Sequence, residues 1–206
     1  MLPTPINNLI QSISSLPGIG KKGATKIILD YLISSREVQD SILKSFIDVR
    51  QQVTKCPNCH YLSEGHKLCG VCSDHSRIDN QIMIVQSAFD VVPIENNGAY
   101  HGRYHILEKL ISPLDKQMVT DTTIYDLETR IEKFLRENPA DTLELIYFVK
   151  HSFASLTTFA YIQDYLKKSK HHERLNFSQL ATGLPTNFNI QQIDQDSFKI
   201  AYENRK

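Results

Sequence analysis

Apolar residues recur every three or four positions through the N-terminal part of the chain, which is the spacing of one face of an amphipathic helix. The first such run extends from Ile6 to Ile13, the second from Ala24 to Leu32, and the third covers residues 37–54. Leu16-Pro17-Gly18-Ile19-Gly20 separates the first two runs, and its proline and glycines interrupt a helix sharply. The pattern therefore predicts three helices, of which the first two are joined by a tight turn.

After Asp79 the pattern changes to short apolar runs that alternate with segments of helical spacing. Candidate strands cover residues 81–85, 143–149 and 175–180, and candidate helices cover residues 87–94, 124–135 and 156–166. We expect Pro93 to limit the first of these helices and Asn138-Pro139 to end the second. Residues 100–115, punctuated by glycine and proline, predict a long structured loop with one short strand. The alternation predicts a small α/β domain with a largely parallel sheet.

All four cysteines of the chain lie in one short stretch. Cys56-Pro57-Asn58-Cys59 is followed, after nine residues, by Cys69-Gly70-Val71-Cys72. Two Cys-x-x-Cys pairs let four thiolates form a tetrahedron around one soft cation, and Zn²⁺ is the first choice for such a set. The sequence thus predicts one structural zinc ion per chain, bound by Cys56, Cys59, Cys69 and Cys72.

Other interpretations of the four cysteines stay open. An iron site of the rubredoxin type uses the same four thiolates, so geometry alone does not separate iron from zinc. Two disulfides would require an oxidising compartment, and the start, Met1-Leu2-Pro3-Thr4-Pro5, shows no secretory signal. A redox dithiol needs only one Cys-x-x-Cys, on a thioredoxin-like βαβ unit. With four thiolates present, we expect the nearby His60, His66 and His75 to be exposed neighbours rather than ligands.

Charge and hydropathy narrow the class of protein. Lysine plus arginine and aspartate plus glutamate each number 23 among 206 residues, so the formal net charge is zero. A neutral chain does not coat nucleic acid by bulk attraction, so any DNA contact must come from local clusters or from several copies acting together. No apolar run approaches the roughly 20 residues that span a bilayer. We therefore expect a cytoplasmic protein with no membrane partner.

A local cluster of that kind lies at the turn between the first two helices. Gly18 and Gly20 form the turn, and Lys21, Lys22 and Lys26 follow at the start of the second helix. Glycine amides and a helix N-terminus can face a phosphate oxygen, as in a helix-hairpin-helix, which contacts the DNA backbone and reads no bases. The alternative is an αα-hairpin with solvated lysines.

Five signatures follow one another along the chain. They are Leu16-Pro17-Gly18-Ile19-Gly20, the four-cysteine stretch, Gly102-Arg103-Tyr104-His105, Ser112-Pro113-Leu114 and Gly183-Leu184-Pro185. In this order they resemble the bacterial RecR family over nearly the whole chain. The resemblance implies a helix-hairpin-helix, a zinc knuckle, a Toprim-like α/β domain and a C-terminal segment that joins subunits into a dimer or a ring-shaped tetramer. It also implies a clamp on duplex DNA and on gapped or single-strand junctions, which works with RecO and RecF to help load RecA onto single-stranded DNA.

The expected organisation is therefore an α+β protein of several modules. Residues 1–54 form the helix-hairpin-helix region, 55–79 the four-cysteine zinc finger, 80–181 the Toprim-like domain and 182–206 the C-terminal oligomerisation segment. Arg103 and His105 invite a functional interpretation, but structural hydrogen bonding within their loop is at least as reasonable.

Carried over by position, the family's basic residues fall on Lys22 and Lys26, and its zinc ligands fall on the four cysteines. The Toprim acids do not carry over, because Gln86 follows the first strand and Ala154-Ser155-Leu156 follows the second. Catalytic Toprim enzymes hold Mg²⁺ through such carboxylates, so we expect a non-enzymatic protein rather than a nuclease, primase or topoisomerase.

Further departures concern partner contacts. The missing acids alter the surface that the family offers to RecO, and Thr186-Asn187-Phe188-Asn189 replaces the family's usual loop of two glycines and an acid. A protein-interaction adaptor, in which the hairpin and the zinc knuckle are only structural, is the remaining alternative.

Overall fold

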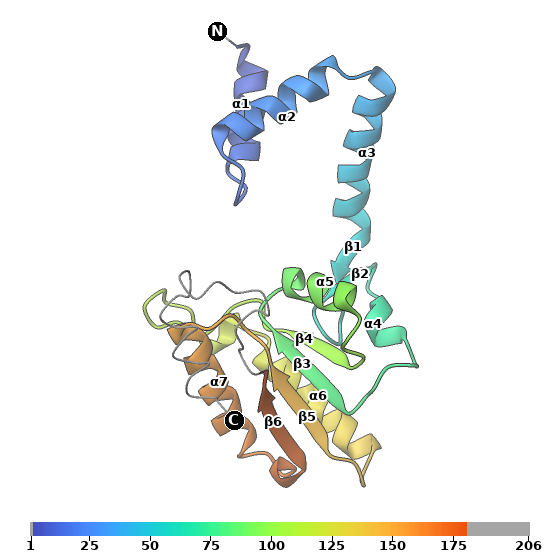
Figure 1. Ribbon diagram of the computed structural model, residues 1–206, viewed down its shortest axis with the longest axis vertical. Coiled ribbons are helices and arrows are strands. Elements are labelled where there is room, and N and C mark those ends of the chain that lie inside the picture. The colour runs from blue at the N-terminus through green and yellow to red at the C-terminus, as the bar shows by residue number, and fades with distance from the viewer. Residues whose placement is uncertain (1, 181–206) are drawn as a thin grey trace, which may run out of the picture. The chain divides into compact units, whose positions relative to one another are not determined.

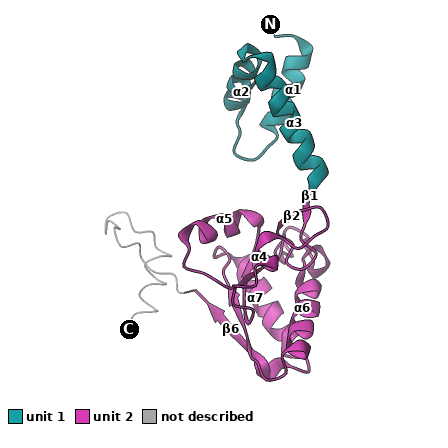
Figure 2. Ribbon diagram, turned by 90° about the vertical axis from the view of Figure 1, so that its right-hand side faces the viewer, with its two compact units in different colours: residues 1–53 teal, residues 54–206 magenta. Residues whose placement is uncertain are grey.

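The structure is a computed structural model that describes residues 2–180 (Figure 1). The expected C-terminal oligomerisation segment, residues 182–206, lies outside the described residues, together with Gly183-Leu184-Pro185 and the loop after it. Two compact units divide the chain between residues 53 and 54 (Figure 2). None of the described helices combines the length and the apolar character needed to cross a lipid bilayer.

The first unit is helical. Helices α1 (Thr4–Ser14) and α2 (Lys21–Ile33) pack together through Ile10, Ala24 and Ile28, which are buried. Gly18 lies in the turn between them with φ 82°, a backbone conformation that residues other than glycine rarely adopt. The two predicted helices and their tight turn are confirmed.

Helix α3 (Arg36–Gln52) completes the first unit and has no buried residue. Its apolar stripe is exposed over six large side chains, Val38, Ile42, Leu43, Phe46, Ile47 and Val49. The helix ends two residues earlier than expected, because Val53 begins a short strand. The helical spacing in the sequence is thus confirmed, but the described part of the chain provides no core for the apolar stripe.

The second unit is built on a four-stranded parallel sheet with the strand order β4-β3-β5-β6. Its strands are β3 (Gln81–Val85), β4 (Arg103–Ile106), β5 (Leu143–Tyr147) and β6 (Leu175–Gln179). The two central strands are mostly apolar and buried along their length, as expected for strands covered on both faces. The predicted α+β class and the parallel sheet are confirmed, and the expected short strand is β4.

Helices cover both faces of this sheet (Figure 1). On one face Ile82 and Ile84 pack with helices α6 (Ile124–Glu137) and α7 (Phe153–Leu166). On the other face Met83 and Val85 pack with Val91 of helix α5 (Ala88–Asn97). Short 3₁₀ turns at η1 (Val119–Asp121) and η2 (His172–Arg174) complete the unit. Because successive strand residues point to opposite faces, the two halves of the core alternate along β3.

Helix α5 continues past Pro93, so the expectation that this proline would limit the helix was wrong. A proline inside a helix removes one backbone hydrogen bond. Here both ends are well capped: Ser87 and Asp90 form a capping box, and Gly98 closes the C-terminus with φ 70°. These caps offset the missing bond, and the helix extends to Asn97.

The four-cysteine stretch is carried by three small elements. Strands β1 (Val53–Lys55) and β2 (Leu62–Glu64) form a two-stranded sheet, and α4 (Gly70–Ser73) is a single helical turn. The N–H of Ile106 on β4 donates to the carbonyl oxygen of Cys59 over 3.0 Å. This bond joins the first cysteine pair to the edge strand of the main sheet.

Candidate metal centre and lysine-bearing hairpin

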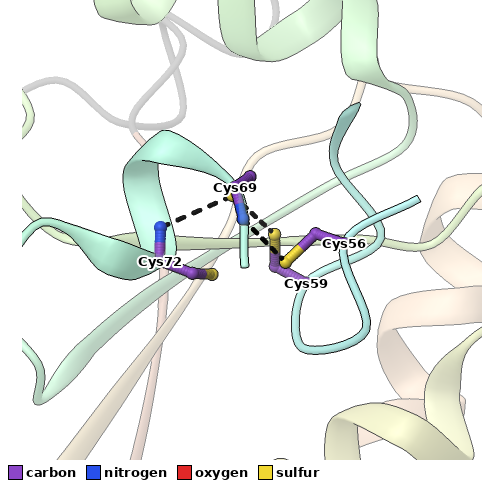
Figure 3. Close-up of side chains that lie close together, drawn as sticks. All are labelled: Cys56, Cys59, Cys69 and Cys72. Carbon is purple, nitrogen blue, oxygen red and sulfur yellow. Dashed lines mark hydrogen bonds between the residues drawn. The ribbon is translucent and has the colours of Figure 1, made fainter. Parts of the chain in front are cut away.

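The four cysteine side chains converge at one point of the second unit (Figure 3). Their sulfur atoms all lie within 4.8 Å of one another, and those of Cys59 and Cys69 are 3.5 Å apart. Four sulfurs that each lie about 2.3 Å from Zn²⁺ are about 3.8 Å apart, so little adjustment would admit the ion. All four cysteines are free, and a disulfide would need sulfurs about 2.05 Å apart. These residues can therefore bind a metal ion, and the disulfide alternative finds no support.

Each of the four sulfur atoms accepts one N–H hydrogen bond, three from the backbone and one from a side chain. The donors are the backbone N–H of Cys69 to Cys56, of Tyr61 to Cys59 and of Cys72 to Cys69, each over 3.4 Å, and Asn58 Nδ2 to Cys72 over 3.5 Å. Bonds of this kind orient thiolate ligands and disperse their negative charge. The local backbone is therefore arranged for sulfur ligands that carry charge.

Four thiols this close cannot all ionise by themselves, because the resulting charges repel. Hydrogen bonds with Cys69 and Cys72 raise the pKa of Cys59 far above its usual value. Hydrogen bonds with Cys59 and Cys69 lower the pKa of Cys72 to about 2, and the positive charge of Arg130 adds to this lowering. A divalent cation removes the conflict, since it holds all four sulfurs as thiolates. The donor set thus fits Zn²⁺, and four thiolates would hold the ion without supplying an open position for catalysis.

The metal-binding stretch is built into the core of the second unit. Cys56, Cys59 and Cys69 are buried, and they belong to the same apolar cluster as Met83 and Tyr104 of the main sheet. The stretch has few large apolar residues of its own. The sheet therefore supplies the apolar contacts that the sequence between the cysteine pairs lacks.

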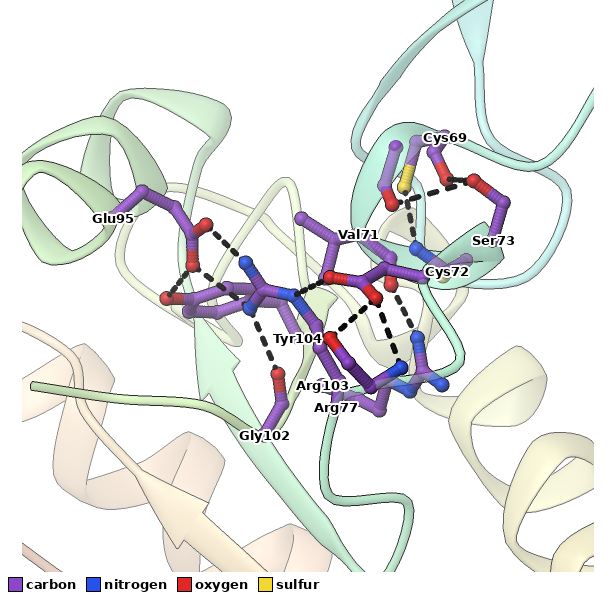
Figure 4. A network of polar contacts seen from close by, with 12 residues as sticks. Cys69, Val71, Cys72, Ser73, Arg77, Glu95, Gly102, Arg103 and Tyr104 are labelled. Carbon is purple, nitrogen blue, oxygen red and sulfur yellow. Dashed lines mark hydrogen bonds and ion pairs between the residues drawn. The ribbon is translucent and has the colours of Figure 1, made fainter. Parts of the chain in front are cut away.

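Arg103 fastens the second cysteine pair to the sheet (Figure 4). Its side chain is almost fully buried; its Nε donates to Asp79 Oδ1 over 2.7 Å, and its Nη1 donates to the carbonyl oxygen of Val71. Val71 lies between Cys69 and Cys72, so this bond holds the helical turn that positions both ligands. Arg103 thus makes structural hydrogen bonds, but Asp79 and Val71 lie outside residues 100–115, so the expectation of bonding within the loop was wrong.

Arg77 makes a second connection, in the same network (Figure 4). It forms an ion pair with Glu95 of α5, and its Nη1 donates to the carbonyl oxygen of Gly102 over 3.1 Å. The hydroxyl of Tyr104 donates to Glu95 Oε1 over 2.7 Å. Burial opposes the ionisation of Glu95, but the hydrogen bonds from Arg77 and Tyr104 lower its pKa overall. The loop after the cysteines is therefore tied to both a helix and a strand.

His105 also has a structural role, but its partner, Thr123, again lies outside the loop. Its imidazole is completely buried, with Nε2 lying 2.9 Å from Thr123 Oγ1 and 3.1 Å from the Thr123 carbonyl oxygen. Burial lowers the pKa of His105 to about 3, so the ring is neutral. A neutral ring that donates through Nε2 leaves its Nδ1 without a partner, as observed.

The three histidines near the cysteines differ in exposure. His66 and His75 are exposed, as expected. The expectation of exposure was wrong for His60, whose side chain is 18% exposed and whose Nε2 lies 3.0 Å from Asp126 Oδ2. Packing against the buried His105 ring, at a centroid distance of 5.5 Å, explains its position. The metal-binding group contains the four cysteines and none of these histidines.

The hairpin of the first unit brings its five predicted residues together. Lys21 and Lys22 are the first two residues of α2, Lys26 lies one turn later, and all three are exposed. A Cβ built at Gly18 or Gly20 would meet no atom within 4 Å, so the space beside the turn is open. No acidic residue lies in the first turn of α2. Each cation at a helix N-terminus is unfavourable by about 0.3–1 kcal/mol, because the positive end of the helix dipole repels it. A bound anion would offset this repulsion.

Comparison with known proteins gives the family. No family model matches the chain. The Recombination protein RecR of Desulforapulum autotrophicum is 32% identical over 206 residues, which cover 100% of this chain and 98% of the relative. The chain belongs to the RecR family. The proteins of the same name from Streptococcus mutans and Syntrophobacter fumaroxidans are 32% and 29% identical, and the matches cover 100% and 99% of this chain and 98% and 96% of the relatives.

Two positions where the RecR resemblance leads one to expect acids lie at one edge of the sheet. Gln86 follows β3, and residues 154–156 lie in the first turn of α7, after β5. Because β3 and β5 are adjacent parallel strands, both positions meet at the carboxyl edge. Ser152 caps α7 there by accepting the N–H of Ser155 over 3.1 Å. These positions provide a capped helix and a neutral amide in place of a carboxylate cluster.

Sequence reasoning missed two residues that lie beside the metal ligands, Asn58 and Arg130. Asn58 lies inside the first Cys-x-x-Cys pair, where a hydrogen-bond donor to a facing sulfur could have been suspected. Arg130 lies on α6, far along the chain from the cysteines, and lines the same cavity as Cys72. Only the tertiary packing brings it there, so no local signal in the sequence points to it.

Proposed function

We propose that this RecR-family chain is a non-enzymatic DNA-binding clamp of recombinational DNA repair, and that its hairpin contacts the DNA backbone. The observation that carries the proposal is the start of α2, where Lys21 and Lys22 are the first two helical residues. The names of the relatives support a role in recombination. A protein acting on chromosomal DNA is expected in the cytoplasm.

The hairpin has the chemistry of a phosphate site. The first intrahelical bond of α2 runs from the N–H of Ala24 to the carbonyl oxygen of Gly20 over 3.0 Å. The preceding amides of the first turn therefore have no carbonyl partner within the helix. With the open space beside Gly20 and the exposed lysines, these amides can contact a phosphate oxygen. Such contacts are independent of DNA sequence, as a clamp requires.

Assembly into a homo-oligomer supports the same proposal. The chain has no net charge, so a single hairpin provides only a modest electrostatic site. The exposed apolar stripe of α3 favours association between copies, because exposed apolar patches of this kind mark protein interfaces. In a dimer or a ring-shaped tetramer, two or four hairpins contribute to one DNA site, and their effects multiply.

The test of the DNA site is Lys22→Ala combined with Lys26→Ala. Duplex and gapped DNA affinities are measured over a series of salt concentrations, with Lys109→Ala plus Lys150→Ala as a control that removes the same charge from exposed positions outside the hairpin and α3. Each lost phosphate contact lowers the slope of log affinity against log salt by about 0.9, so the slope should fall by about 1.8 for each hairpin engaged. An unchanged slope in the test variant, or an equal change in the control, would refute the assignment.

We further propose that the four cysteines bind one structural zinc ion per chain. Elemental analysis of the purified protein distinguishes zinc from iron, and Cys56→Ser should lower both the metal content and the melting temperature. Cys56→Ser should reduce stability without directly reducing DNA affinity, because the hairpin lies in the other unit. A protein that keeps its melting temperature after complete chelation would contradict a structural role for the metal.

RecO and RecF are the proposed protein partners, and help in loading RecA onto single-stranded DNA is the proposed outcome. The family resemblance supports these partners, but Gln86 and residues 154–156 alter the acid-dependent surface for RecO. We therefore expect RecO binding to depend less on salt here than it does when that surface is acidic. Titration of RecO from the same organism at two ionic strengths tests this. No RecO binding at either ionic strength would contradict the partnership.

A further inference from the structure

The four metal ligands differ in their access to solvent. Cys56, Cys59 and Cys69 are 0%, 0% and 2% exposed, whereas Cys72 is partly exposed. Cys72 also lines a cavity of about 220 Å³, and it is the one cysteine that does so. A small molecule that approaches the metal centre from solvent through this cavity therefore meets Cys72 before the other three cysteines.

The sulfur of Cys72 is also held differently from the others. Its side-chain hydrogen-bond donor is Asn58 Nδ2, at 3.5 Å, whereas the donors to the other three sulfurs are backbone N–H groups fixed by the fold. A side-chain donor is free to rotate away from the sulfur, and a backbone donor is not. The restraint on Cys72 is therefore the weakest of the four.

Positively charged side chains in the same cavity also help to hold the Cys72 sulfur in place. Arg130 and Lys133 line the cavity with Cys72. The guanidinium of Arg130 is held in place because its Nη1 donates to the carbonyl oxygen of Tyr104 over 2.5 Å. Four thiolates around one divalent cation carry a net negative charge, and nearby cations stabilise such a group. The acids of the cavity are Asp79, which pairs with Arg103, and Glu137.

We propose that Cys72 is the reactive ligand of the metal centre, the site at which a small uncharged electrophile modifies the protein and thereby releases the metal. This inference rests on the proposed metal centre. Asn58 and Arg130 are positioning residues that hold the Cys72 thiolate as a ligand and slow this reaction.

The chemistry of the step is a nucleophilic substitution. An electron pair of the Cys72 thiolate forms a sulfur–carbon bond to the electrophile as the carbon–halogen bond breaks, and the halide leaves with its electron pair. No proton moves, because the sulfur is already a thiolate in the metal-bound state. The product is an uncharged thioether, a much weaker ligand for Zn²⁺ than a thiolate. Cys56, Cys59 and Cys69 alone would hold the ion less tightly, so the modified protein should lose it.

The experiment uses the metal-loaded full-length protein and iodoacetamide as the probe. Metal content is measured before the reaction, and the protein is treated with less than one equivalent of reagent. Peptide mass spectrometry then locates the first carbamidomethyl group, and a chromogenic chelator in the same sample follows metal release. We expect the first modification at Cys72 and metal release with the same rate constant.

Variants test the positioning residues. Arg130→Gln and Asn58→Ala should each raise the rate constant of metal release by roughly tenfold, the lower end of the effects seen for partners of metal ligands. Arg130→Lys should recover most of the wild-type rate, because it keeps the charge. Arg136→Gln is the matched control, since Arg136 is exposed on the same helix and does not line the cavity. Melting temperatures are recorded for each, and Asn58→Ala supplies the test if Arg130→Gln does not fold.

The possible results distinguish a failure of the Cys72 assignment from a failure of the proposed metal centre. Protein that carries no metal before the reaction would contradict the metal centre itself. Metal-loaded protein modified first at Cys56, Cys59 or Cys69, or at all four cysteines with equal rates, would overturn the assignment of Cys72. Wild-type release rates in Asn58→Ala and in folded Arg130→Gln would overturn the positioning roles.

Discussion

The buried imidazole of His105 predicts how acid destabilises the second unit. Burial lowers the pKa of His105 from 6.5 to about 3, so in this interval the unfolded chain binds a proton that the folded protein excludes. Stability must therefore decrease as the pH falls from about 6.5 towards 3. Each proton that the unfolded chain binds in excess of the folded protein lowers the free energy of unfolding by about 1.4 kcal/mol per pH unit. Lowering the pH from 7 to 5 should thus remove about 2 kcal/mol from the free energy of unfolding.

Urea unfolding followed by circular dichroism at several pH values between 7 and 5 measures this loss. His105→Gln keeps a donor for the Thr123 carbonyl oxygen but does not titrate. This variant should be less stable than wild type at pH 7, and its stability should decrease little further between pH 7 and 5. His172→Gln is the control, because His172 is exposed. Metal content is verified at each pH, since protonated thiols release metal. If His105→Gln and wild type lose stability equally between pH 7 and 5, the buried imidazole does not govern the acid response.

Two further predictions concern the network around the cysteines and the exposed helix. Glu95→Gln removes the ion pair with the partly buried Arg77 and should lower stability at neutral pH by about 1–3 kcal/mol. Because the pKa of Glu95 is lowered, this difference should shrink as the pH falls below 4.5, and equal melting temperatures at pH 7 would contradict the role of the pair. Phe46→Asp places a charge in the apolar stripe of α3 and should shift the protein towards monomer in light scattering with unchanged helix content. A wild-type protein that is already monomeric at micromolar concentration would rule out α3 as an interface between copies.

The elements that could be predicted are those whose local pattern reflects their final surroundings. The strand at residues 81–85 is predictable because Ile82 to Val85 are buried and read as a continuous apolar run. The metal ligands are predictable because their spacing along the chain is itself the requirement of the site. The Gly18 turn is predictable because its positive φ favours glycine.

The features that could not be predicted depend on contacts between distant residues. A short strand is expected within residues 100–115, but its position is not evident from the sequence, because Arg103 and His105 look polar although both are buried with partners from other segments. Helix α5 passes through Pro93 because its two caps offset the missing bond. The approach of Arg130 to Cys72 requires the whole α/β unit to fold, and no local pattern encodes it.

The carboxyl edge of the sheet provides a last prediction, because a Mg²⁺-dependent Toprim enzyme would bind its ions there. Mg²⁺ is held in proteins through carboxylates, and this edge has the neutral Gln86 and, at the start of α7, Ala154. We therefore expect the melting temperature in millimolar MgCl₂ to equal the melting temperature in NaCl of the same ionic strength. Combining Gln86→Glu with Ala154→Glu should lower the melting temperature, because the new carboxylates add negative charge and Ala154 packs against the core, and Mg²⁺ should recover part of this loss. A Mg²⁺-specific rise in wild type would show that other oxygen ligands bind the ion and that a Toprim-type metal site is present after all.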